Sequence, residues 1–500
     1  MFKSSTLRGL ALGLAVTAST FGSLPARAET PAGTKVLLVH TNDVHGNLEP
    51  DSKGRGGMAR VATLLNRLRA ENPGAVAYVD LGDIAQGTPV SNIFHGEPMV
   101  AVMNYLKPVA ATLGNHEFDW GVRAMEEMTG KARYPLVVAN LVDGKGRLPF
   151  APYRITRVAG VNIGFIGLMS PDTPLYVMKG NMGDYRVTDP AAAVRKYLPE
   201  MRRKWAEVIV VLAHEGVDAD HLLAADVPQI NLIIGGHSHT KIEAAQRVGR
   251  TAIVQADKYG RFVGVVEMTV DRHADRVLGV ESRVIEINDK SGLEPDPKVV
   301  ALIEKYNQKV KPVMAQVVGE AAGELQKKTG PGEADSTLGN VIADAMRIQT
   351  GSDVSVYNYG GIRDDAMAAG PITKGTVFKI LPFDDQVVQI RLKGSDLLEI
   401  LGQGARMKEG PLQVSGVEVV APLEGPLEAR VDGKPLDPAA FYTVATTEFM
   451  AGGGDGYQAL TRGEIVKRLA VARDVFMDYL AARKVLAVPA TGRIRLADKK

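Results

Sequence analysis

Five short polar clusters in the first half of the chain each directly follow an apolar run. They are Thr41-Asn42-Asp43-Val44-His45, Gly82-Asp83, Gly114-Asn115-His116-Glu117, Ala213-His214-Glu215 and Gly235-Gly236-His237-Ser238-His239. Together they contain five of the nine histidines of the chain, two aspartates and two asparagines. Side chains of these types bind hard-to-borderline divalent cations, and two such ions about 3.5–4 Å apart can clamp a phosphoryl group for in-line attack. The clusters therefore predict a metal-dependent hydrolytic centre.

One histidine of these clusters has no obvious role as a metal ligand. His116 is followed by Asp119, three residues further on. A carboxylate that orients and charges a histidine makes it a suitable electrophile or general acid for a leaving oxygen. We therefore expect His116 and Asp119 to be catalytic.

Each motif taken singly has an ordinary structural explanation. A glycine and an aspartate after a strand are usually a plain turn, and a lone histidine is more often packed than functional. The prediction depends on all five clusters standing at strand ends, because ligands of open α/β sheets gather beyond the carboxyl ends of the strands.

The elements that must position these clusters follow from the hydrophobic pattern of the first half. Short β-branched runs alternate with amphipathic helical stretches, which is typical of a layered α/β domain. Strands are predicted at 36–41, 75–81, 109–113, 136–140, 163–168, 208–213, 230–234, 263–270 and 283–287, and helices at 58–69 and 191–205.

The composition of the chain changes near residue 290. Residues 289–297 are rich in turn formers, and residues 297–310 form one charged helical pattern, which is either a connector or an ordinary surface helix. The second half predicts mixed α+β structure, with helices at 338–350, 395–403 and 472–483 and strands at 354–357 and 386–392. We predict a first domain over 35–290, a connecting helix over 297–312 and a second domain over 313–497.

Composition excludes several classes of protein. The 500 residues contain no cysteine, which rules out disulfides, iron–sulfur clusters and cysteine nucleophiles. Lys and Arg total 59 against 57 for Asp and Glu, so a large basic surface for binding a nucleic-acid polymer or anionic lipid is not expected.

Residues 1–28 combine a cationic start, a short apolar run and Ala26-Arg27-Ala28, which predicts a secretory signal peptide. With no later apolar stretch of about 20 residues, we expect an exported, periplasmic or secreted protein without a membrane anchor.

The order of the five clusters resembles the calcineurin-like metallophosphoesterase domain, and residues 35 to 497 resemble the secreted bacterial 5′-nucleotidase family. The resemblance implies an α/β fold, a layered α/β/β/α sandwich with a second α+β nucleotide-binding domain. It implies one metal ion held by Asp43, His45 and His239, a second held by Asn115, His214 and His237, and Asp83 bridging them. It also implies that His116, paired with Asp119, is the catalytic histidine.

The second half carries motifs of the same family. Asn358-Tyr359-Gly360-Gly361-Ile362-Arg363 resembles its N-x-G-G-I-R loop, whose asparagine and arginine contact the nucleotide. Phe383 and Phe449 correspond to the two aromatics that sandwich the base, and Asp455 to the aspartate near the ribose. Two aromatic faces stack a nucleobase, at about 1–3 kcal/mol per base, and an arginine can grip phosphate oxygens in a bidentate fork. The alternative for both phenylalanines is core packing.

One stretch departs from the family pattern. Members usually carry further arginine just before Leu338, whereas residues 333–337 here are acidic and contain none. The grip on phosphate is then weaker, or is supplied by Lys327, Lys328 or Arg391, which leaves the substrate preference open.

We therefore expect a metal-dependent enzyme that hydrolyses nucleoside 5′-monophosphates such as AMP through a hydroxide bound to two divalent ions, zinc, manganese or similar. A hinge near 297–312 would bring metal and base pockets together. The alternatives are a phosphodiesterase, a nucleotide-sugar or di- or triphosphate hydrolase, a thiosulfate-oxidising hydrolase of the same superfamily, or a catalytically silent periplasmic protein that binds metal or nucleoside. The partner is a small-molecule nucleotide, and the oligomeric state is open.

Overall fold

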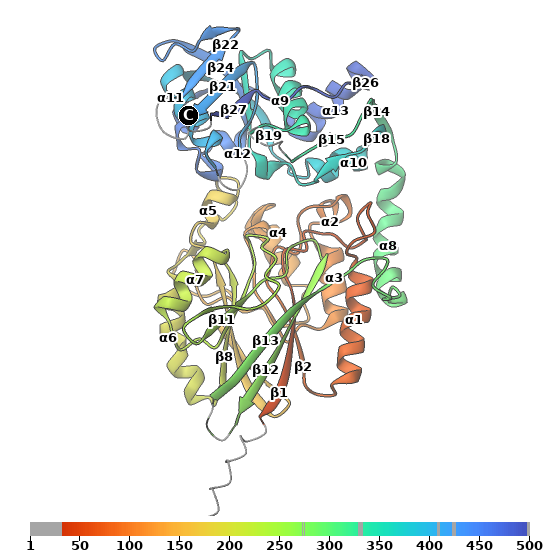
Figure 1. The fold of residues 1–500 in the computed structure, drawn as a ribbon, viewed down its shortest axis with the longest axis vertical. Helices are drawn as coiled ribbons and strands as arrows, with labels where there is room; N and C mark the ends of the chain where they lie inside the picture. Colours follow the sequence, from red (N-terminus) through yellow and green to blue (C-terminus); the bar gives the residue numbers. More distant parts are fainter. Residues whose placement is uncertain are drawn as a thin grey trace, which may run out of the picture.

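The chain folds into two bodies that lie one above the other (Figure 1). The computed structural model describes residues 33–272, 274, 276–328, 334–407, 411–422 and 427–497. Helix α8 (Pro297–Met314) runs along one side of both bodies and packs against helices of each. The predicted signal peptide lies outside the described residues, so export stays a prediction. The predicted domain limits also stay predictions.

The N-terminal body is built on two sheets. The first has the order β13 (Arg276–Glu286), β12 (Phe262–Asp271), β1 (Thr34–Thr41), β2 (Val76–Asp80) and β3 (Ala110–Ala111). The second has the order β10 (Gln246–Val248), β11 (Thr251–Val254), β9 (Leu232–Gly235), β8 (Val208–His214), β6 (Val161–Met169) and β5 (Tyr153–Val158).

Alternating side chains of these strands build the layers. Val36 and Leu38 of β1 point into a core shared with Val210 and Leu212 of β8, so the two sheets pack face to face. The other face of the first sheet packs on α1 (Met58–Glu71), α3 (Glu97–Leu106) and α8. The outer face of the second sheet is covered by α6 (Pro190–Arg203) and α7 (Val217–Asp226). The predicted α/β/β/α sandwich is confirmed.

Strand register brings the polar clusters to one edge of the sandwich. In the first sheet Thr41 pairs with Asp80 of the parallel neighbour, and Asp80 with Ala111. In the second sheet Ala213 pairs with Gly235. Because these parallel strands end level with one another, the loops that follow them leave from the same edge, towards the C-terminal body.

The predicted strand at 136–140 is wrong. The segment forms only isolated bridges, Leu136 with Ala111 and Val137 with Ala151. Its successive backbone N–H groups donate to three different partners, Val137 to Ala111, Val138 to Ala151 and Ala139 to Gly167. The segment therefore crosses between strands instead of joining either ladder, although its apolar composition is that of a strand.

The C-terminal body centres on a five-stranded sheet with a hydrophobic core on each face. The sheet has the order β20 (Gln413–Ser415), β16 (Val354–Tyr357), β24 (Phe441–Thr447), β19 (Gln386–Lys393) and β25 (Glu464–Val471). Helices α9 (Thr337–Thr350), α10 (Lys374–Ile380) and α13 (Ala472–Arg483) share one core with it. The other core contains α11 (Gly394–Ala405) and a four-stranded sheet in the order β23 (Lys434–Pro435), β22 (Glu428–Val431), β21 (Val417–Pro422) and β27 (Ile494–Ala497).

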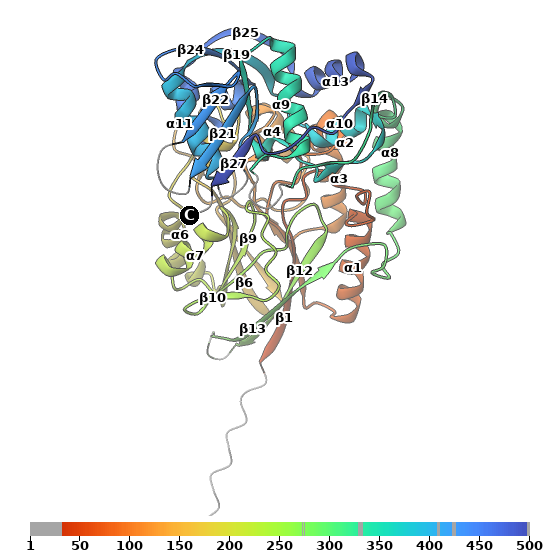
Figure 2. The same ribbon diagram turned by 45° about the horizontal axis from the view of Figure 1, so that its top comes forward.

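A smaller sheet completes this body beside α8 (Figure 2). It has the order β18 (Gly370–Thr373), β14 (Val317–Ala321) and β26 (Val485–Leu486). The predicted helix at 472–483 and strand at 354–357 occur with the same bounds. In the part of the chain that the structure describes, no helix has both the length and the apolar character needed to cross a bilayer.

A buried histidine between the two sheets gives the fold a pH dependence. His40 lies on β1, is 1% exposed, and its ring packs against Gly264. Burial lowers its pKa to about 3. In the unfolded chain the same side chain titrates near its ordinary value of 6.5, so acidification protonates the unfolded state first.

We predict that His40 costs the fold stability as pH falls below 6.5. Each pH unit between the two pKa values removes up to about 1.4 kcal/mol, or roughly 2–3 kcal/mol between pH 6.5 and 4.5. The His40→Leu variant lacks this titration, so its unfolding free energy should fall less over that range. Urea unfolding of both proteins in EDTA measures the difference, and parallel pH profiles would contradict the prediction.

Candidate metal and nucleotide site

The loops at the upper edge of the N-terminal sandwich bring six of the predicted ligands into two adjacent groups. Donor atoms of Asp43, His45 and His239 lie within 4.8 Å of one another, as do those of Asp83, His214 and His237. The His239 Nε2 lies 3.5 Å from Asp43 Oδ1, and the His214 Nε2 lies 3.1 Å from Asp83 Oδ2. The two groups meet where His45 Nε2 lies 3.8 Å from Asp83 Oδ2. This is a layout for two neighbouring cations.

The backbone at these donors is held in an uncommon conformation. Positive φ angles occur at Asp43 (52°), His45 (48°), Asp83 (51°), His237 (73°) and His239 (54°). Residues with a Cβ seldom adopt this left-handed region, and such strain of about 1–3 kcal/mol each clusters at functional sites. This backbone conformation accompanies the close approach of the donor atoms within each group.

Two of the rings are oriented by carbonyl oxygens behind them. The His45 Nδ1 lies 3.1 Å from the carbonyl oxygen of Gln86, and the His214 Nδ1 lies 2.6 Å from that of Leu81. A carbonyl accepts a hydrogen bond only from a protonated ring nitrogen, so Nδ1 carries the hydrogen and Nε2 faces the donor group.

The pKa values of the buried donor residues favour a bound cation. Burial raises the pKa of Asp83, but His214 and His116 outweigh it and hold this pKa well below its ordinary value. Burial lowers the pKa of His237 to about 3, so its ring is neutral and free to bind a cation. In His214, burial lowers the pKa but Asp83 raises it further, to about 10. A proton on His214 thus offsets charge that a metal ion would otherwise neutralise.

Asn115 supplies a donor that has no partner among the described residues. Its Oδ1 is buried there without a hydrogen bond, and its side chain lines the same cavity as Asp83 and His237. An unpaired buried amide oxygen is costly unless a ligand uses it. Histidine nitrogens, carboxylates and an amide oxygen together fit divalent ions such as zinc or manganese, so the residues present fit the implied metal. Their individual roles stay predictions.

His116 and Asp119 form a close pair beside these donors. The His116 Nδ1–H donates to Asp119 Oδ2 at 2.8 Å. Burial lowers the pKa of His116, but the carboxylates of Asp119 and Asp83 raise it above its ordinary value. A charged ring held in this way can donate from Nε2. The structure also groups His116 with His45 and Asp83 as possible ligands, so the catalytic and ligand roles need an experiment to separate them.

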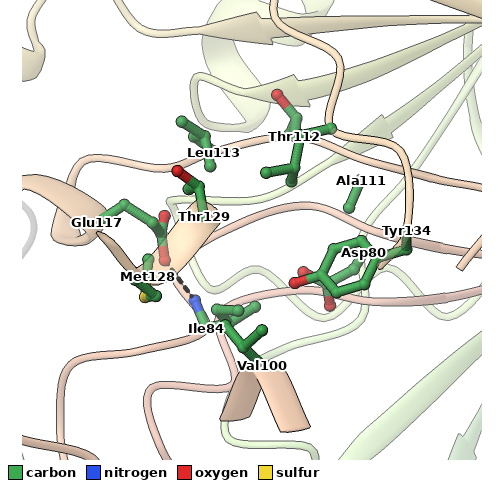
Figure 3. Close-up of a pocket in the computed structure, with 11 residues that line it drawn as sticks. Asp80, Ile84, Val100, Ala111, Thr112, Leu113, Glu117, Met128, Thr129 and Tyr134 are labelled. Atoms are coloured by element: carbon green, nitrogen blue, oxygen red, sulfur yellow. Dashed lines mark hydrogen bonds between the residues drawn. The ribbon is translucent and has the colours of Figure 1, made fainter. Parts of the chain in front are cut away.

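Glu117 is a residue of the site that sequence reasoning did not assign. Its carboxylate accepts hydrogen bonds from the backbone N–H groups of Asp83, Ile84 and Gly114, and Figure 3 shows the contact with Ile84. It is fully buried, which raises its pKa to about 7. By tying two loops together, Glu117 fixes the positions of Asp83 and its neighbours. Its place directly after His116 was the available signal.

The residues predicted to bind a nucleotide come from the C-terminal body and line one cavity. Phe383 lies with its ring centroid 5.6 Å from that of His116, at 30°. The Asn358 Nδ2 donates to Asp455 Oδ2 at 2.6 Å. The ring of Phe449 lies on Gly454, where an added Cβ would meet it at 2.5 Å. Both phenylalanines are half-buried and line the cavity, so neither is a plain core residue.

Arg363 connects this cavity to the metal donors. Its Nη2 lies 3.0 Å from His45 Nε2, and its guanidinium lies 5.7 Å from the Phe383 ring centroid. Its carbonyl oxygen accepts a hydrogen bond from the Tyr259 hydroxyl of the N-terminal body at 2.9 Å. Asn92 adds a second link by donating to the Pro382 carbonyl oxygen at 2.7 Å. The cavity between the two bodies has a volume of about 540 Å³, within the usual range for small-molecule sites.

The possible substitutes for the missing arginine differ in position. Lys327 lines the cavity. Lys328 is exposed and does not line it, and Arg391 is exposed and lies over the Phe441 ring at 4.2 Å. In the acidic stretch, Asp335 accepts hydrogen bonds from the Gly492 and Ile494 backbone. That acidic residue therefore has a structural role.

Comparison with known proteins agrees with this arrangement. The calcineurin-like phosphoesterase family matches residues 36–241, and the 5′-nucleotidase C-terminal domain matches residues 317–462. A crystal structure of a 5′-nucleotidase precursor from Thermus thermophilus is 31% identical, with a TM-score of 0.84 over 93% of this chain and 100% of that chain. A 5′-nucleotidase from Vibrio cholerae serotype O1 is 27% identical over 540 residues, 96% of this chain and 98% of that protein.

A third relative is larger. Endonuclease YhcR from Bacillus subtilis (strain 168) is 31% identical over 453 residues, which are 83% of this chain but 37% of that protein. The matches to both halves, and a structural relative covered along its whole length, lead to one conclusion: the chain is a phosphoesterase that belongs to the 5′-nucleotidase family.

Proposed function

We propose that this phosphoesterase hydrolyses nucleoside 5′-monophosphates to nucleoside and orthophosphate, with two divalent metal ions. The observation that carries the proposal is that both aromatic rings, Arg363 and four of the predicted metal donors line one cavity; the four donors are Asp83, Asn115, His237 and His239. A phosphate at the donors and a base at Phe383 and Phe449 then belong to a single molecule. The names of the relatives, two of them 5′-nucleotidases, support the same substrate class.

The proposal divides the donor residues between two ions. Asp43, His45 and His239 would hold one ion and Asn115, His214 and His237 the other, with Asp83 shared. When bound, the ions supply charge for the phosphoryl oxygens and an acidified water.

The protein's own groups orient the substrate and manage a proton. His116 points its Nε2 away from Asp119 and can donate a hydrogen bond to a phosphoryl oxygen or a proton to the departing 5′-oxygen. Arg363 can bind phosphate oxygens, and Asn358 and Asp455 offer polar groups for the ribose beside the two rings. Closure of the cavity by both bodies limits access of bulk water.

The first test is phosphate release from AMP, ADP, UDP-glucose, 2′,3′-cyclic AMP and p-nitrophenyl phosphate, with Mn²⁺, Zn²⁺ or EDTA. We expect AMP to be preferred and EDTA to abolish turnover, because the donors need a cation to bind phosphate. Release from the aryl phosphate alone would retain the metal centre and reject the nucleotide pocket. No release from any compound would favour a silent binding protein.

The aromatic clamp is tested at Phe449, which lies on Gly454 within the C-terminal body. We expect Phe449→Ala to raise KM for AMP about tenfold or more, since stacking contributes about 1–3 kcal/mol per base. Ribose 5-phosphate carries the same phosphate without a base, so its kcat/KM should be unchanged. Equal losses for both substrates would show that Phe449 acts by packing.

His116→Gln separates catalysis from metal binding. Loss of a positioned acid lowers kcat by about 10²–10⁴, while two metal ions per chain should remain by elemental analysis. Asp119→Asn should lower kcat less, because the histidine ring remains. If His116→Gln instead loses one metal ion, His116 is a ligand and the catalytic assignment is wrong.

A further inference from the structure

A group of cations lines the cavity beside the metal donors. Lys258 follows β11 in the N-terminal body, whereas Lys327 and Arg363 come from the C-terminal body. The Lys327 Nζ donates to the carbonyl oxygen of Ile362 at 2.6 Å and lies 4.1 Å from the Tyr359 ring centroid. The Lys258 Nζ lies 4.9 Å from the ring centroid of Tyr259, whose hydroxyl binds the Arg363 carbonyl oxygen. Both lysines therefore lie near the backbone of Ile362 and Arg363.

These cations form no close ion pair with any carboxylate of the described residues. No carboxylate oxygen of that part of the chain lies within 4.0 Å of a charged nitrogen of Lys258, Lys327 or Arg363. The nearby Asp365 is engaged by Arg261 at 3.5 Å and by Arg55 at 3.9 Å, both from the N-terminal body. A buried or half-buried cation without a close carboxylate partner is costly unless an anion binds beside it.

Two further details favour an anionic ligand beside these cations. The Arg363 Nε is buried without a hydrogen-bond partner among the described residues. Burial lowers the pKa of Lys327 to about 7, and Lys258 and Arg363 lower it further than Asp364 and Asp365 can raise it. A bound anion would satisfy Arg363 and restore the charge of Lys327.

We propose that Lys258 and Lys327 join Arg363 in a phosphate subsite, assembled from both bodies, that selects a terminal phosphoryl dianion over a phosphodiester monoanion. The proposal rests on the proposed function, because it concerns the same cavity. Lys327 is here a specificity-determining residue, in a chain that lacks arginine at 333–337.

The selection follows from charge. A monoester near neutral pH carries two negative charges on its phosphoryl group and a diester carries one, so each added cation favours the monoester. The same cations bind orthophosphate, the product, and should make it a competitive inhibitor. An ammonium group is a compact donor that can bind any phosphate oxygen. A lysine can therefore bind phosphate where no arginine is present to donate two parallel hydrogen bonds.

The test uses Lys327→Met and Lys258→Met, with Lys328→Met as the matched control because Lys328 is exposed and outside the cavity. For each Mn²⁺-loaded protein, inhibition by orthophosphate and kcat/KM for AMP and bis(p-nitrophenyl) phosphate are measured. Because charged hydrogen bonds are the stronger class, we expect Ki for orthophosphate and KM for AMP to rise roughly tenfold or more in both cavity variants. The diester should be affected far less, and Lys328→Met should match the wild type.

A binding measurement excludes a merely structural role. Calorimetric titration of orthophosphate into each Mn²⁺-loaded protein should show the same loss of affinity, and Lys327→Arg should recover most of it. Equal losses for monoester and diester, or unchanged phosphate affinity in both lysine variants, would overturn the proposal. If the wild type releases phosphate from AMP in that case, the proposed function stands and only the subsite is wrong. A wild type that releases none but binds orthophosphate through both lysines would reject the function alone.

Discussion

The negative charge of two buried aspartates determines what the N-terminal half of the site must contain. Asp43 and Asp83 are at most 1% exposed, and among the described residues their ion-pair partners are histidines alone. Buried carboxylates without cationic partners are expensive, so the surrounding groups must bring positive charge to them. A proton on His214 or His116, whose pKa values are raised, supplies part of this charge, and the rings and carboxylates together can hold divalent ions. Burial of the two carboxylates therefore favours a bound cation at this position.

The sandwich supplies what this arrangement needs. Level strand ends deliver the loops to one edge, and packed layers on both faces keep those ends from moving. Left-handed backbone at five donors then turns the side chains inward. Glu117 holds two of the loops by three hydrogen bonds from backbone N–H groups. The surrounding packed structure therefore stabilises the strained backbone at the donors.

The C-terminal body adds opposite charge and an apolar clamp above the same edge. Direct hydrogen bonds from Asn92 and Tyr259 join the two bodies near the cavity. Movement between two such domains is the default expectation unless their interface is large and hydrophobic. Because Lys258 lies on one body and Lys327 on the other, closure would also bring their charges together around a ligand.

Local sequence determined much of this protein. The apolar runs located most strands and helices, since burial imposes a period on each element, and the residue types after those runs identified the donors and the family. Only the tertiary structure decided how these parts meet. The segment at 136–140 has a strand's composition, yet its N–H groups find partners on three different segments. Glu117, Tyr259 and Lys258 gain their roles from neighbours distant in sequence, which a local pattern cannot reveal. The charge balance of the cavity, with Lys327 on a carbonyl oxygen and Asp365 already engaged by two arginines, likewise exists only when both bodies are in place.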